Sequence, residues 1–197
     1  MRSRANVRGA LAAAIVIAVM APSPQAASVV APTFDAMVAR ARSVFVGQTL
    51  DVQSRWVSTS SGPAIVTVVT FKVVRTLKGE LGGQTQLEFL GGTVGEDRLE
   101  VPGIPRFRVG DEDVLFVDER GQPVSPVVGF MHGRFRVLEE PGTGRRSVAR
   151  YNFEPLASVA DIGAAAPGPR VRSARALSLA DFEGEIARAL RRQPQAK

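Results

Sequence analysis

One residue of the chain, His132, could serve general acid–base catalysis near neutral pH. A nucleophilic triad would also need a hydroxyl beside it and a buried carboxylate. Ser125 lies in Val-Ser-Pro and not in the Gly-x-Ser-x-Gly turn of a nucleophile. The absence of cysteine excludes thiol chemistry and cysteine-containing zinc sites. We therefore predict no catalytic residue, no metal site and no cofactor, and we place His132 at the edge of a strand.

Arginine supplies nearly all of the positive charge, with only three lysines among 25 basic residues. Arg134 and Arg136 share one face of a predicted strand, and Arg146 and Arg150 share one face of its partner. If the two faces coincide, the four side chains form a basic stripe. Such a stripe is either a binding patch or the solvated face of a hairpin. The acidic triplet 111–113 lacks the pattern of a calcium loop and is interpreted as a solvated turn.

The glycine- and proline-rich stretch 91–110 is the best candidate for a recognition surface. Its prolines restrict the backbone, so we expect a stiff arm. Arg106 and Arg108 flank Phe107, so an inward Phe107 turns both arginines outward. The alternative is that the stretch plugs one end of the domain. Together with the neighbouring strand edge, the candidate partner-binding residues are Arg106, Arg108, Met131, His132, Arg134 and Arg136.

The first 27 residues have the order of a secretory signal peptide. Residues 2–8 hold three arginines, residues 10–20 are uncharged and apolar, and residues 21–27 contain prolines and small residues. The apolar run is shorter than the ~20 residues of a membrane span. We predict a signal peptide over 1–27 and a secreted or periplasmic protein. An uncleaved leader, the alternative, would be its only membrane contact.

The net charge of +6 arises mainly at the two ends of the chain. Residues 28–169 are close to neutral, with 15 basic and 16 acidic side chains. A protein that binds nucleic acid concentrates positive charge on its folded surface. We therefore predict no nucleic-acid partner.

Hydrophobic periodicity predicts a mainly β domain over residues 28–157. A short helix is expected at 33–43, with Thr33 as its N-cap. The first strand is long and alternating, so we expect a bend with a bulge at Gly47. Residues 113–118 are apolar on both faces, which is typical of a central strand. The predicted strands cover residues 44–57, 64–77, 84–90, 113–118, 127–131, 133–138 and 146–152.

The C-terminal part divides into two segments. Residues 158–176 show no apolar period and are predicted to form a linker. Residues 177–197 are predicted to form a helix capped by Ser178, followed by a basic tail. The many short strands favour a small antiparallel β-barrel of the OB or netrin-like type, with a short N-terminal helix and a C-terminal helix. A β-sandwich is the alternative.

A series of motifs runs from Val44 to Leu138. The motifs are Val-Phe-Val-Gly at 44–47, Phe-Lys-Val-Val-Arg-Thr-Leu-Lys-Gly at 71–79, Gly-Gly at 91–92, Val-Pro-Gly-Ile-Pro-Arg-Phe at 101–107, Gly-Asp-Glu-Asp-Val-Leu-Phe at 110–116 and the run 128–137. In this order they resemble a family of uncharacterised bacterial secreted proteins, which has no established activity to carry over. The order is also similar to the netrin-like domain of tissue metalloprotease inhibitors. Those inhibitors chelate zinc through an N-terminal cysteine, so their mechanism cannot apply to this chain.

These observations predict a non-catalytic secreted or periplasmic module that binds a protein or cell-envelope partner. Two alternatives remain open: a hydrolase with an unlocated Asp/Glu site, and a structural envelope component. Two carboxylates that face each other in a pocket would favour the hydrolase, and a closed, filled barrel would favour the binding module.

Overall fold

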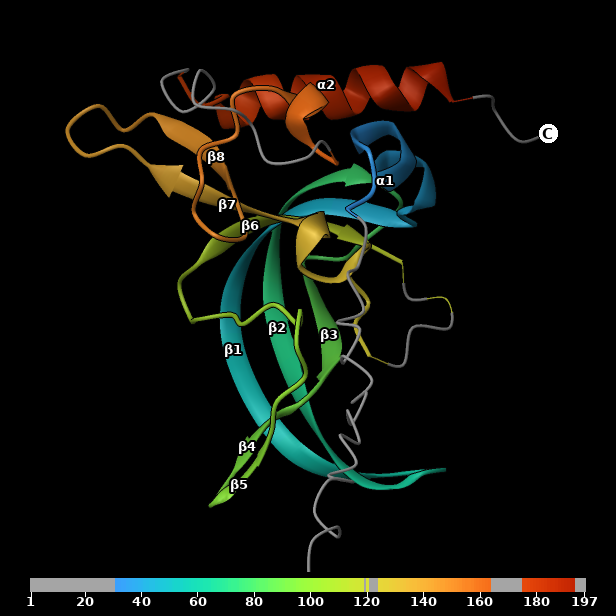
Figure 1. Cartoon of the computed structure of the whole chain (residues 1–197). Helices are drawn as coiled ribbons and strands as arrows, with labels where there is room; N and C mark the ends of the chain where they lie inside the picture. The colour runs from blue at the N-terminus through green and yellow to red at the C-terminus, as the bar shows by residue number, and fades with distance from the viewer. Residues whose placement is uncertain (1–30, 119, 121–123, 164–174, 194–197) are drawn as a thin grey trace, which may run out of the picture.

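The structure, a computed structural model, describes residues 31–118, 120, 124–163 and 175–193. It is mainly β, with one antiparallel six-stranded sheet, a separate two-stranded sheet and two α-helices (Figure 1). The predicted signal peptide lies outside the described residues. The elements are α1 (Phe34–Arg40), β1 (Ser43–Thr59), β2 (Gly62–Lys78), β3 (Gln84–Leu90), β4 (Gly92–Val94), β5 (Asp97–Leu99), β6 (Glu112–Val117), the 3₁₀ helix η1 (Phe130–Gly133), β7 (Arg134–Glu139), β8 (Arg146–Arg150), the 3₁₀ helix η2 (Val159–Asp161) and α2 (Leu179–Arg192).

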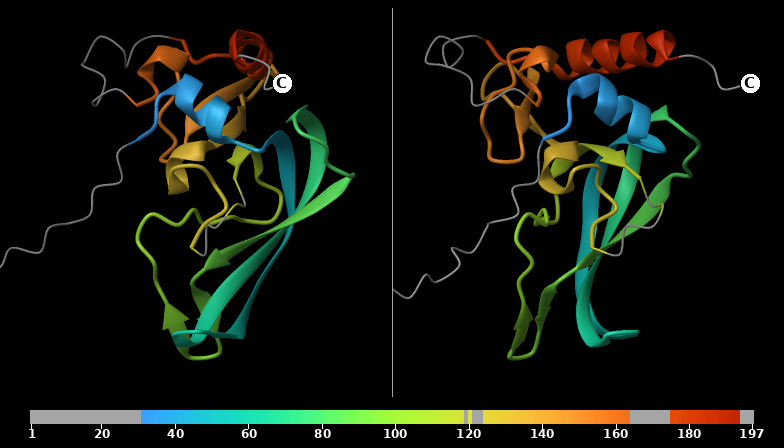
Figure 2. Two further views of the ribbon diagram at one scale, coloured as in Figure 1. Left: turned by 90° about the vertical axis from the view of Figure 1, so that its right-hand side faces the viewer. Right: turned by 45° about the vertical axis from the view of Figure 1, so that its right-hand side comes forward.

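The large sheet is open. Its strand order is β3-β2-β1-β6-β7-β8, so β3 and β8 are edge strands that do not pair with each other. The prediction of a closed barrel is therefore wrong, although the mainly β class and both terminal helices are confirmed. The sheet curves strongly, and the β4–β5 hairpin, which is a separate sheet, lies against its concave side (Figure 2).

The curvature begins in the β1–β2 hairpin, whose strands are 17 residues each. Their pairing shifts register at three places, one of them between Val46 and Gly47. A Cβ on Gly47 would lie 2.6 Å from the ring of Phe45, so a side chain at this position would collide with the core. The pairing is irregular beside Gly47, as predicted, but the extra residue there is Val74 of β2, and the extra residue of β1 is Leu50. Such extra residues bend the strands.

The central position of β6 is also confirmed, since it pairs with β1 on one side and β7 on the other. Val114 and Phe116 point to the helix-covered face, whereas Leu115 and Val117 point to the opposite face. Apolar residues on both faces are what a strand with a core on either side requires.

Helices α1 and α2 cover one face of the sheet. Their contact surface is a cluster of phenylalanine rings, with centroids 4.9–6.3 Å apart in tilted and edge-to-face pairs. Such pairs add to the stabilisation from apolar burial. The rings belong to Phe34, Phe116, Phe135 and Phe182.

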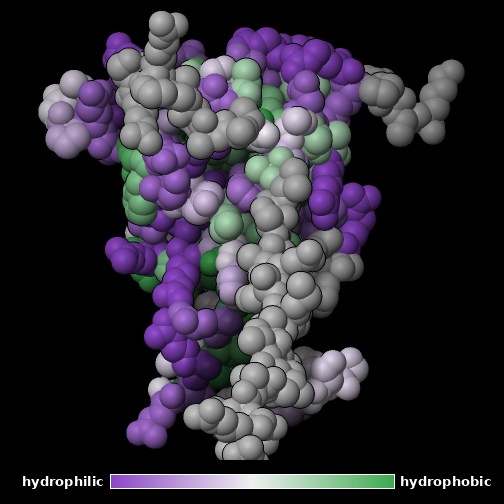
Figure 3. Space-filling model, in the orientation of Figure 1, coloured by the Kyte–Doolittle hydropathy of each residue, from purple (hydrophilic) through white to green (hydrophobic). Residues whose placement is uncertain are grey.

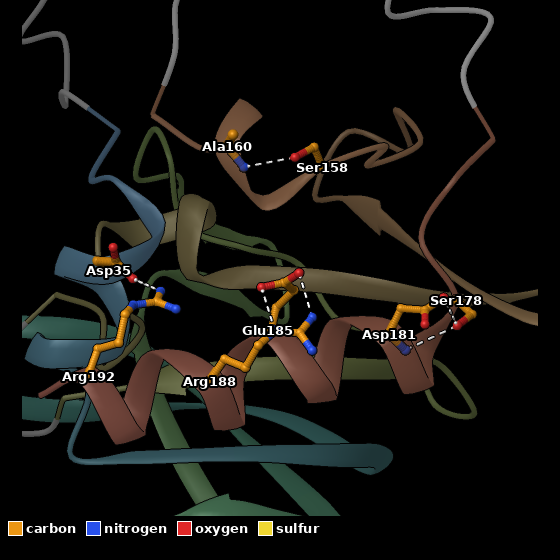
Figure 4. Close-up of polar contacts among 8 residues, drawn as sticks. All are labelled: Asp35, Ser158, Ala160, Ser178, Asp181, Glu185, Arg188 and Arg192. Carbon is orange, nitrogen blue, oxygen red and sulfur yellow. Dashed lines mark hydrogen bonds and ion pairs between the residues drawn. The ribbon is translucent and has the colours of Figure 1, made fainter.

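Hydrogen bonds and ion pairs cap α2 and join it to α1 (Figure 4). The Ser178 side chain accepts a hydrogen bond from the N–H of Asp181 and caps α2, as the sequence predicts. The last turn of α2 is joined to α1 by an ion pair of 2.7 Å between Arg192 and Asp35. No helix in the described ranges is long and apolar enough to cross a membrane.

The opposite, concave face is covered by the stretch 91–110. Phe107 points inward, the condition under which its neighbouring arginines were expected to point outward, because its ring packs on Phe71 and Phe89 with centroids 5.2 Å away. The stretch is not a plain loop, since it contains the β4–β5 hairpin. It covers the second hydrophobic core, to which Phe107 and Ile104 belong.

Two other segments differ from expectation. Residues 127–131 do not form a strand, because Gly129 has φ 64° and starts the turn of η1. The first six residues of the predicted linker, 158–163, are folded onto the domain, with Ser158 capping η2 and Ile162 buried. Residues 164–174 of that linker lie outside the described residues.

Candidate ligand-binding pocket

The arginines of β7 lie inside the molecule. Arg134 and Arg136 are only 3% and 8% exposed, so the interpretation of this face as solvated is wrong. Arg150 pairs in register with Phe135, and its side chain therefore points to the other face of the sheet. The four predicted arginines do not form one stripe. Arg134 and Arg136 instead face the concave side, beneath the stretch 91–110.

Acidic residues at the start of β6 compensate this buried charge. Arg134 donates two hydrogen bonds of 2.8 Å to the two carboxylate oxygens of Asp113, which is fully buried. Burial raises the pKa of Asp113, while the hydrogen bonds from Arg134 oppose that rise. Asp111 Oδ2 lies 2.7 Å from Arg136 and 3.5 Å from Arg134. The acidic triplet is therefore not a solvated turn.

Each of the three side-chain nitrogens of Arg134 has a hydrogen-bond partner in this arrangement. Its remaining terminal nitrogen donates to the backbone carbonyl of Arg106, and its guanidinium lies 4.1 Å from the centre of the Phe107 ring. The side chain therefore fixes the stretch 91–110 over the sheet. We assign it a structural role in holding the pocket wall.

Arg136 is not saturated. Its Nε is buried without a hydrogen-bond partner, and the neighbouring Asp111 Oδ2 also lacks one despite its ion pair. The guanidinium lies 4.2 Å from the ring centre of Phe153, a largely exposed residue with φ 67°. Buried polar groups are nearly always paired, so an unsatisfied pair beside a cavity indicates a place for a polar group from outside.

These side chains surround a cavity of about 360 Å³. Arg106 and Arg108 stand exposed at its rim, as predicted from the inward Phe107. Among the described residues, the side chain of Arg108 makes no ion pair or hydrogen bond, and only its backbone carbonyl accepts one, from the N–H of Asp111. Asp111 is the only acidic residue of the lining, against four arginines. The lining residues are Gly103, Ile104, Pro105, Arg106, Arg108, Asp111, Met131, Arg134, Arg136, Tyr151 and Phe153.

Five of the six candidate residues predicted from the sequence thus line one pocket. His132 is the exception: it lies in η1, not at a strand edge, and its ring meets the edge of Tyr151 at 5.7 Å between centroids. It lines a separate, small hollow beside Arg150. Sequence reasoning missed Asp111, Tyr151 and Phe153. The spacing of Asp111 and Asp113, two residues apart like the two arginines, is the signal that could have revealed the pairing.

The arrangement offers positive charge, hydrogen-bond donors and aromatic surface, which suit an anionic ligand. No group of His, Asp or Glu able to hold a metal ion occurs in the ranges that the structure describes. Comparisons with protein-family models, curated proteins and solved structures give no match for this chain.

Proposed function

We propose that the protein is a non-catalytic binding module that recognises an acidic group of a protein partner in the arginine pocket. The observation that carries the proposal is the buried, unpartnered Nε of Arg136 in a pocket that is also lined by the unpaired side chain of Arg108. A carboxylate that entered the pocket would add an acceptor for these arginines, of which Arg136 has Asp111 as its one acidic partner among the described residues. It would also meet a pocket whose arginines outnumber its acids.

The rest of the pocket favours a peptide over a bare ion. Met131, Tyr151 and Phe153 provide apolar and aromatic contact next to the charged groups. Exposed aromatic residues close to arginine are typical of partner-binding surfaces. Consistent with the leader predicted at 1–27, we place the interaction in the periplasm or outside the cell. The OB or netrin-like character of the domain belongs to the same proposal, supported by the long curved β1–β2 hairpin.

Calorimetric titration with a hexapeptide of glutamate, at low and at physiological ionic strength, tests the proposal. Arg108→Gln removes an unpaired exposed charge and should leave the fold intact. We expect it to weaken binding about three- to tenfold, as does loss of one charged contact. Arg136→Gln should weaken binding further. Arg55→Gln, which breaks an exposed ion pair with Glu88, is the matched control.

Two results would overturn the proposal: no binding of the peptide to the wild-type protein, or equal affinity of the wild type, Arg108→Gln and Arg136→Gln. If the peptide binds as expected, a photoreactive phenylalanine analogue at position 153 can capture the natural partner in the cell envelope. Its yield should fall when Arg108→Gln is added.

A further inference from the structure

A second cavity, of about 290 Å³, lies between the concave side of β1–β3 and the β4–β5 hairpin with the segment that follows it. Figure 3 shows this face of the molecule, where hydrophilic residues border a recess with apolar residues visible inside it. The volume is just below the ~300–1,000 Å³ of typical ligand pockets. The lining residues are Val52, Ser54, Thr67, Val69, Phe89, Leu90, Gly91, Gly92, Thr93, Arg98, Leu99, Glu100, Val101, Ile104, Pro105, Arg106 and Phe107.

The interior of this cavity is suited to an apolar group. Nine of its 17 lining residues are aliphatic or aromatic, and two of its three hydroxyls, those of Ser54 and Thr67, are already satisfied. Thr67 donates its single hydroxyl proton to the carbonyl of Gly91, at 2.6 Å. The 2.9 Å contact with Ser54 must therefore run from Ser54 to Thr67. No hydroxyl proton of this pair is left for a polar ligand group.

The mouth of the cavity is charged. Arg98 and Arg106 both donate to the same oxygen of Glu100. These hydrogen bonds, that of Arg106 first, lower the pKa of Glu100, so it stays ionised at neutral pH. Two guanidiniums against one carboxylate leave a net positive charge, and all three side chains are largely exposed. Each guanidinium has five N–H donors, so both retain free ones.

The cavity is held open by tight seating of the hairpin on the sheet. Gly92 has φ 144°, and a Cβ there would lie 2.4 Å from the hydroxyl oxygens of both Ser54 and Thr67. The N–H of Thr93 also donates to Ser54, and that of Gly91 donates to the carbonyl of Ile65. The spacing between hairpin and sheet is therefore set before any ligand arrives, which lowers the entropy cost of binding.

We propose that this cavity binds a single-chain anionic amphiphile, whose apolar chain enters it and whose carboxylate or phosphate contacts Arg98 and Arg106. The charge at the mouth selects an acid over an alcohol or a cation. The volume selects one short chain over a two-chain lipid. This site is distinct from the proposed partner site, although Ile104, Pro105 and Arg106 border both cavities.

Titration with four eight-carbon probes below their micelle-forming concentrations tests this inference. They are octanoate, octyl phosphate, octanol and octyltrimethylammonium. We expect the two anions to bind about tenfold more tightly than octanol, for one charge-assisted contact, and the cation not to bind. Trp56, the only tryptophan, lies two residues beyond Ser54 on the same strand face, so its emission should shift on binding.

Two variants locate the site. Leu99→Trp should fill the cavity and abolish octanoate binding. Arg98→Gln should weaken octanoate about three- to tenfold while leaving glutamate-peptide affinity unchanged, because Arg98 borders only this cavity. Arg108→Gln should do the reverse. Failure of one site is thereby distinguished from failure of the other.

The inference is overturned if octanol binds as tightly as octanoate, if no probe binds, or if Leu99→Trp leaves octanoate affinity unchanged. Binding of anionic phospholipid vesicles without binding of octanoate would also overturn it, since it would indicate a membrane surface in place of a free amphiphile. Melting curves show whether Leu99→Trp is folded. Arg98→Gln changes only an exposed side chain. Its octanoate affinity therefore tests the inference even if Leu99→Trp does not fold.

Discussion

The pair formed by Arg134 and Asp113 allows a quantitative test of the buried charge network. Either partner alone would be left as an uncompensated charge in the core, which costs about 3–5 kcal/mol. In a protein of this size that corresponds to a fall of about 6–20 °C in melting temperature, at ~2–4 °C per kcal/mol. Arg134→Met and Asp113→Leu should each show this loss.

The double variant should be much more stable than the sum of the single changes. An apolar pair of similar volume replaces a buried ion pair at little or no net cost. We expect a coupling energy of at least about 2 kcal/mol from urea unfolding followed by circular dichroism. Arg55→Met, in an exposed ion pair with Glu88, is the control and should cost at most ~1 kcal/mol. Additive losses, or single losses no larger than the control, would refute the reasoning.

Three further predictions concern the core, the acid limit of stability and the hairpin. Phe116→Ala should cost about 3–5 kcal/mol in urea unfolding, because the ring is fully buried. The hydrogen bond from Arg120 lowers the pKa of Asp118. The ionised Asp118 carboxylate therefore stabilises the fold at pH values above its unfolded pKa, near 3.8. This stabilisation is lost as the pH falls through the lower pKa of Asp118 in the folded protein. Stability of Asp118→Asn should fall below wild type at pH 7, and the gap should close in acid melts. Gly92→Ala should cost about 1–3 kcal/mol and speed hydrogen exchange at the Thr93 N–H.

The strands could be predicted from the sequence because the order of apolar and polar residues in each strand shows which of its faces are buried. Alternation marks β1 and β2, and apolar residues on both faces mark β6 as central. Closure of the sheet is different, since it depends on whether the distant strands β3 and β8 meet. Local periodicity holds no information on that pairing. The prediction of a strand over 127–131 was wrong for a local reason. Gly129 adopts the left-handed conformation and starts the 3₁₀ helix η1 within this apolar run.

The part of the site that depends on local alternation of side chains could be predicted, whereas the part that depends on strand pairing could not. The outward position of Arg106 and Arg108 follows from the inward Phe107, since neighbouring side chains in extended backbone alternate. The burial of Arg134 could not be inferred from its own strand, where arginine usually marks solvent. It depends on the β6–β7 register, which sets Leu115 opposite Arg134 and so brings Asp113, two residues away on the same face, within reach.

The segment Ile104–Pro105–Arg106 forms a wall of both cavities. Any displacement of this wall changes the two cavities together, so their occupants cannot be energetically independent when the wall moves. By thermodynamic linkage, a ligand that alters the affinity for its neighbour by some factor has its own affinity altered by the same factor. The short wall thus gives the domain the means to make one binding event conditional on another.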